Sequence, residues 1–194
     1  YPQVCPSLKA DHSRQLRLLK RLREIPGIRK VFIASGIRHD LVLADQKHGI
    51  EYLQEILSYH TSGQMKIAPE HMSRRVLALM GKPARESVVR FKKLFAKLNE
   101  RTGKKQFLTY YFIAAHPGCT MEDMRGLKSF AARELGATPR QVQIFTPLPS
   151  TWSALMYYTG IDPADGRKIY VEKDRGEKQK QKDMATAKKR PGLR

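Results

Sequence analysis

The chain has 194 residues, 41% of them hydrophobic, which is enough to form a domain with its own apolar core. Its 37 lysines and arginines outnumber its 18 aspartates and glutamates, and the resulting net charge of +19 favours an anionic partner. No apolar run approaches the roughly 20 residues that cross a bilayer, so no membrane partner is expected.

The chain begins with a short stretch that has no secondary-structure pattern. Residues 1–10 (YPQVCPSLKA) lack the charged and apolar regions of a signal peptide, and the sequence does not start with Met. We therefore expect a piece of a longer protein, with residues 1–10 as a linker from a missing upstream part. The two cysteines, Cys5 and Cys119, are too few for a disulfide framework and fit a reducing cytoplasm.

Apolar periodicity predicts helices alternating with strands from residue 11 to residue 160. The expected helices cover residues 11–24, 45–60, 73–80, 86–101, 121–135 and 152–158. The expected strands cover residues 31–35, 65–68, 107–115 and 142–146. The third strand is almost continuously apolar, which is typical of a strand covered on both faces. Thr120 and Asp123 have the spacing of a capping box at the start of the helix that follows.

Right-handed crossovers would arrange four such strands as a parallel sheet, either open or curved into part of a barrel. The segments that follow the strands would then meet at one edge of the sheet, where α/β folds place ligands. The four segments read GIRHD (36–40), PEH (69–71), HPGCT (116–120) and PLPST (147–151), and the first three carry charged or imidazole groups. Glycine-rich fingerprints of dinucleotide or nucleotide binding are absent from the sequence.

Several residues at this edge have alternative interpretations. His116 could act as a general base, as in a free-standing sugar-phosphate enzyme, or could simply cap the turn. Arg75, one helical turn after Glu70 and His71, could bring a cation to a ligand or form an ordinary ion pair. Arg38 with Asp40 could line a pocket mouth or form a surface salt bridge.

Residues 161–194 are rich in charge and poor in apolar side chains, and we expect a basic, disordered tail there. Together with the charged helix faces, this tail supports an alternative function, that of a basic RNA-binding α/β module.

Four segments taken in order resemble the core of YgiQ-like radical S-adenosylmethionine (SAM) proteins between residues 33 and 160. They read IASGIRHDL (33–41), KIAPEH with VLALMGKP (66–83), YFIAAHPGCTMEDM (111–124) and QVQIFTPLPSTWSALMYYTG (141–160). The resemblance implies a (β/α)₆ partial barrel, of which residues 11–160 would supply about four parallel strands with flanking helices.

The same resemblance implies an enzyme with two cofactors. In that family a C-x-x-x-C-x-x-C loop holds a 4Fe-4S cluster, and the cluster reduces SAM to release a 5′-deoxyadenosyl radical. This chain has no such motif, so the cluster ligands would lie in the missing N-terminal half and the fragment alone would be inactive. The substrate and the catalytic residues stay unknown.

Matching positions assign SAM-binding roles. The turn at Glu70 and His71, with Arg75, would face the methionine moiety or the ribose. The backbone from Ala114 to Gly118 would lie along the adenine, and Phe145 to Pro147 would close that side. Ser35 and Arg38 would lie nearer SAM or the substrate. The full expected set is Ser35, Arg38, Glu70, His71, Arg75, Ala114, His116, Pro117, Gly118, Phe145 and Pro147.

On this assignment His116 lines the pocket and is not a base. Cys5 is a weak candidate ligand for an auxiliary metal site, and no role carries over to Cys119.

Overall fold

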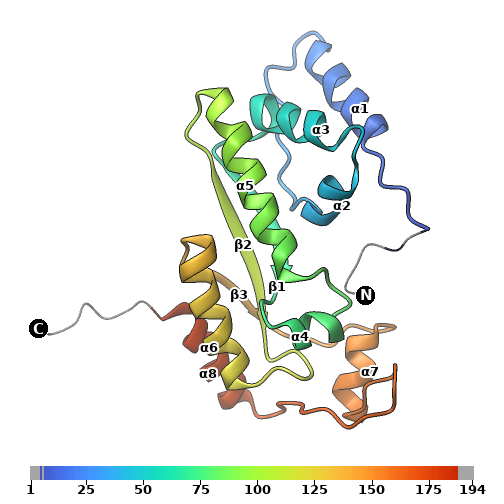
Figure 1. Ribbon diagram of the computed structural model, residues 1–194, viewed down its shortest axis with the longest axis vertical. Helices are drawn as coiled ribbons and strands as arrows, with labels where there is room; N and C mark the ends of the chain where they lie inside the picture. Colours follow the sequence, from blue (N-terminus) through green and yellow to red (C-terminus); the bar gives the residue numbers. More distant parts are fainter. Residues whose placement is uncertain (1–4, 6, 188–194) are drawn as a thin grey trace, which may run out of the picture. The chain divides into compact units, whose positions relative to one another are not determined.

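The computed structural model describes residues 5 and 7–187 and divides them into two compact units (Figure 1). The first unit comprises the described residues up to Ala68 together with Glu86–Thr109. The second comprises Pro69–Arg85 and the described residues from Tyr110 onward. No helix in the described part of the chain is long and apolar enough to cross a membrane.

Helices dominate the first unit. They are α1 (Ser13–Glu24), α2 (His39–Ala44), α3 (Gly49–Glu55), a π-helical turn η1 (Ile56–His60) and α5 (Arg85–Thr102). Helix α1 packs against α3, and Leu16, Leu53 and Phe91 are among the buried side chains. The single helix expected at residues 45–60 starts only at Gly49, and in the turn before it the Asp45 carboxylate accepts hydrogen bonds from the backbone N–H groups of Lys47 and His48.

The sheet has three parallel strands in the order β1 (Gln64–Glu70), β2 (Phe107–Ala114) and β3 (Gln141–Ile144). In the parallel pair of β2 with β3, Tyr111 lies opposite Gln141 and Ala114 opposite Ile144.

The strand expected at residues 31–35 was a wrong prediction, since no strand is assigned there. The Ile33 N–H donates to the His60 carbonyl and the Ile37 N–H donates to the Lys66 carbonyl, with one isolated parallel bridge between Ile37 and Ile67. One hydrogen bond to η1 and one to β1 do not build a ladder.

The second unit contains α4 (Arg74–Leu79), α6 (Met121–Phe130) with the π-helical turn η2 (Ala131–Leu135), α7 (Trp152–Thr159) and α8 (Arg175–Thr186). Helix α8 lies beside α6 and against β3. The prediction of a disordered tail was therefore wrong for α8, which Asp174 caps and which buries Gln181 and Ala185. Residues 188–194 of that predicted tail lie outside the described residues.

Strand β2 is enclosed on one face, not on both as predicted. Tyr110, Phe112 and Ala114 are buried, whereas Tyr111 and Ile113 between them are only half-buried. Alternate residues of a strand point to opposite faces, so the second face of the sheet is partly open in this unit.

Helix α7 contains no charged residue, yet it leaves large side chains in solvent. It buries Ala154 and Met156, while the exposed fractions of Trp152 and Tyr158 are 68% and 71%.

Candidate functional site

A pocket of about 350 Å³ lies at the carboxyl ends of the strands in the second unit. It brings together three residues expected at the site from separate segments, namely Glu70, His116 and Phe145. The complete lining is Glu70, Met80, Tyr111, Ile113, His116, Gln143, Ile144, Phe145, Thr146, Leu148, Thr151 and Ser153.

The register of the sheet explains part of this lining. Ile113 on β2 is the direct partner of Gln143 on β3, and partners in a parallel pair point to the same face. Tyr111, two residues before Ile113, shares that face. The pocket therefore occupies the open face of the sheet.

Left-handed backbone at residues other than glycine is concentrated at this edge. Three described residues other than glycine have positive φ, and they are Glu70 at 65°, Ala115 at 57° and Ser150 at 60°. Glu70 ends β1, Ala115 follows β2, and Ser150 lies in the segment after β3. Such conformations cost about 1–3 kcal/mol each and persist where surrounding contacts impose them. The strand ends are therefore held in a specific, strained shape.

Both ring nitrogens of His116 have partners. Nδ1 lies 2.8 Å from the Pro117 carbonyl oxygen and Nε2 lies 2.8 Å from the Ser153 hydroxyl. Burial lowers the pKa of His116 to about 4, so the ring is neutral at neutral pH. Because a carbonyl can only accept, Nδ1 carries the proton and Nε2 accepts from Ser153. The ring also packs edge-on against Phe145, with 5.0 Å between centroids.

Glu70 supplies a carboxylate to the pocket. Its Oε1 lies 2.8 Å from Lys82 Nζ, and its side chain is 21% exposed. The pair places an anion at the rim with one cation beside it.

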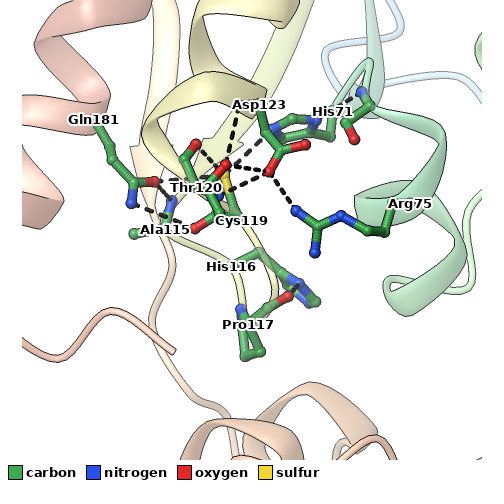
Figure 2. Close-up of polar contacts among 10 residues, drawn as sticks. His71, Arg75, Ala115, His116, Pro117, Cys119, Thr120, Asp123 and Gln181 are labelled. Carbon is green, nitrogen blue, oxygen red and sulfur yellow. Dashed lines mark hydrogen bonds and ion pairs between the residues drawn. The ribbon is translucent and has the colours of Figure 1, made fainter. Parts of the chain in front are cut away.

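His71, which follows the pocket-lining Glu70, forms a buried contact with Cys119 (Figure 2). His71 Nδ1 accepts the Ser73 backbone N–H at 2.9 Å, so Nε2 carries the proton and faces Cys119 Sγ at 3.5 Å. Burial lowers the pKa of His71 to about 4 and raises the pKa of Cys119 to about 12. Both groups are therefore neutral, and they do not form the thiolate–imidazolium pair of a cysteine nucleophile.

Sequence reasoning missed Gln181 on α8, whose side chain joins both ends of the turn from Ala115 to Cys119 (Figure 2). Its Oε1 accepts the Ala115 N–H at 3.1 Å and faces Cys119 Sγ at 3.4 Å, while its Nε2 donates to the Cys119 carbonyl at 3.4 Å. The Gln181 amide thus supplies hydrogen bonds to backbone groups at both ends of this turn, as a neighbouring strand would. The available sequence signal was Asp174 three residues before Glu177, a helix-start pattern whose hydrogen bond is present at 2.8 Å.

Arg75 lies in an ion pair with Asp123, with 2.6 Å between Nη2 and Oδ2. Asp123 also completes the predicted capping box with Thr120, which is confirmed. The ion-pair alternative for Arg75 is therefore the arrangement observed.

Gly118 is enclosed by protein. Its N–H donates to the Tyr170 carbonyl at 2.6 Å, and a Cβ added there would lie 2.2 Å from Leu79 Cδ1. With φ at 83°, this position needs glycine for its backbone and for its contact with Leu79.

The remaining expected residues are distributed as follows. Ala114 is buried in β2 and its carbonyl accepts the Phe145 N–H at 2.8 Å. Pro147 is half-buried between two pocket-lining residues. Ser35 and Arg38 belong to the first unit, where Ser35 is exposed and Arg38 donates two hydrogen bonds to Asp40 at 2.8 and 2.6 Å.

Among the described residues, no group of three or more histidine, cysteine, aspartate or glutamate side chains could hold a metal ion. Cys5 is exposed and free, so any metal bound there would need ligands from elsewhere.

Comparison with known proteins gave no matching family model but several similar proteins. A UPF0313 protein of Fusobacterium nucleatum is 56% identical over 98% of this chain, which covers 34% of that protein. A UPF0313 protein of Methanosarcina acetivorans is 47% identical over 95% of the chain, covering 24% of its own length. A third, from Thermotoga neapolitana, is 43% identical over 98% of the chain, covering 33%. The chain is thus homologous, over nearly its whole length, to a segment that makes up about a quarter to a third of UPF0313 family proteins.

Proposed function

We propose that this chain is the C-terminal part of the catalytic core of a YgiQ-like radical SAM enzyme, and that the pocket binds part of SAM. One observation carries the proposal. Glu70, His116 and Phe145, assigned to SAM from three separate segments, line one pocket at the carboxyl edge of the sheet. The partly open sheet face would then be the inner wall of a partial barrel completed by the rest of the polypeptide.

The chemistry of the lining suits a positively charged nucleoside. The Glu70 carboxylate can accept from an ammonium group or ribose hydroxyls, and Phe145 and Tyr111 offer aromatic surface for a purine ring. The amide of Gln143 and the hydroxyl of Thr146 add hydrogen-bonding groups. A pocket of about 350 Å³ is within the usual range for small-molecule sites.

In this proposal bound SAM would supply a carbon radical, with methionine as the leaving group, on one-electron reduction by an iron–sulfur cluster held by a segment outside these residues. The residues of this chain bind SAM, fix its orientation and exclude water. Neutral His116 contributes a packed wall, because its two nitrogens are already bonded to Pro117 and Ser153.

The decisive experiment uses the full-length protein, reconstituted with iron and sulfide under anaerobic conditions. We expect reductive cleavage of SAM to 5′-deoxyadenosine. A loaded cluster without any cleavage would refute the catalytic proposal. The 194-residue chain treated in the same way should gain no charge-transfer absorbance, and a stable cluster on it would contradict the placement of the ligands.

A binding experiment addresses the pocket itself. In the full-length protein, Phe145→Ala should weaken SAM binding by about 5- to 150-fold, because an aromatic contact with a base is worth about 1–3 kcal/mol. Phe107→Ala is the matched control, since Phe107 is 62% exposed and does not line the pocket. Equal affinities of both variants would remove Phe145 from the SAM site.

A further inference from the structure

A pocket for SAM leaves the excess positive charge of the chain unexplained, and the outer face of α1 offers an explanation. Arg14, Arg17 and Arg21 recur there at three- and four-residue spacing, so they lie on one side of the helix, opposite the buried Leu16 and Leu19. All three are exposed and form no ion pair or hydrogen bond with a described residue. We call these three the α1 arginines.

Two acidic groups near α1 are engaged by other cations on its α3 side. Lys20 Nζ lies 2.6 Å from Glu51, and Arg23 Nη1 lies 2.6 Å from Glu55, both on α3. The cations that face α3 are thus neutralised within the protein, and the α1 arginines face solvent.

The α1 arginines border a shallow hollow of about 660 Å³ with an apolar floor. Leu18 and Ile25 contribute to this floor and are 56% and 44% exposed. Glu24 is the one carboxylate in the lining, at the C-terminal end of the helix. At 1.5 Å per residue, Arg14 and Arg21 are about 10 Å apart along the helix, so the α1 arginines form a row of cations that can contact more than one phosphate of a strand.

We propose that this face binds single-stranded nucleic acid through its phosphates. Arginine matches phosphate oxygens in bidentate fashion and can stack on bases, and the apolar floor offers further surface to an unpaired base. The net charge of +19 would attract such a polyanion from a distance.

Two other partners fit the same face less well. On the helix, Leu18 and Ile25 alternate with Arg14 and Arg21, so insertion of the apolar side chains into a bilayer would also submerge the guanidinium groups. An acidic amphipathic helix would need a continuous apolar stripe on this face to pack against, and the arginines interrupt that stripe.

The test measures binding of a fluorescent oligo(U) of about 16 nucleotides by anisotropy, from about 50 to 200 mM KCl. Replacing the α1 arginines in an R14Q/R17Q/R21Q variant should reduce the slope of log K against log salt by about 2, since each contact contributes about 0.7. Oligo(dT) should show a similar change in slope, because the expected contacts are to phosphates, which DNA and RNA share.

The matched control removes three exposed cations from α5 in the same unit, as K93Q/K97Q/R101Q. It changes the net charge equally and should leave the slope within about 0.5 of wild type. Equal losses in both variants would mean diffuse attraction and would overturn the assignment. So would a wild-type chain that binds no oligonucleotide, or one that binds only phosphatidylserine vesicles or an acidic helical peptide. Circular dichroism of all variants verifies that each is folded.

Discussion

Replacing Gln181 by alanine should destabilise the second unit and release the turn that forms the pocket wall. The change removes the acceptor of the Ala115 N–H, a buried donor bonded at 3.1 Å, and leaves that donor unsatisfied. An orphaned buried donor costs about 1–3 kcal/mol. The contacts to Cys119 are longer, at 3.4 Å, and add little. We expect a loss of about 2–3 kcal/mol in the free energy of unfolding.

For a chain of this size, that loss corresponds to roughly 5–10 °C in Tm. Urea unfolding followed by circular dichroism gives the free energy directly. Two controls separate hydrogen bonding from other effects. Gln181→Met keeps the volume without the polar atoms and should recover less than half of the loss. Gln179→Ala, on the same helix, breaks only an exposed contact to Asp183 and should cost about 0.5 kcal/mol or less. If Gln181→Met were as stable as wild type, packing and not the amide would hold the turn, and the reasoning would be refuted.

Acid should destabilise the fold early, because burial holds the pKa of His71 and of His116 at about 4, below the ordinary 6.5. The unfolded chain takes up these protons first, so the free energy of unfolding is highest above pH 6.5 and falls on acidification by up to about 1.4 kcal/mol per pH unit per histidine. Urea midpoints that stay constant from pH 7 to pH 5 would contradict this. Gly118→Ala should cost about 2 kcal/mol or more beyond Gly81→Ala, because both have positive φ but only the added Cβ at Gly118 meets a neighbour within 4 Å. Equal unfolding free energies of the two variants would show that the clash of the added Cβ with Leu79 does not affect stability. Thr120→Ala should cost about 1 kcal/mol through loss of the cap of α6, visible as a lower Tm.

Local signals predicted those parts of the fold that depend on local chemistry. The capping box of Thr120 and Asp123 starts α6 as expected, and β1, β2 and β3 lie where the apolar runs were found. What failed depended on partners distant in the chain. Residues 31–35 have the composition of a strand, but strand pairing requires a ladder that this composition cannot specify.

The α8 helix shows a second limit. Only Gln181 and Ala185 of its twelve residues are buried, so it has no apolar stripe to distinguish it from a charged coil. Gln181 is important because of two backbone groups more than sixty residues earlier in the chain, and nothing in its own neighbourhood in the sequence indicates them. Likewise, the sequence does not indicate that Asp123 is the carboxylate with which Arg75 forms an ion pair.

The exposed indole on α7 has a practical consequence for experiments on this protein. Trp152 is the only tryptophan in the chain, and it is already 68% exposed in the folded state. Its emission should therefore change little when the chain unfolds, which is why circular dichroism is the better probe of stability. The same indole adjoins Thr151 and Ser153, which line the pocket. Tryptophan fluorescence thus changes little on unfolding, but it can report a ligand or a polypeptide segment that covers this end of α7.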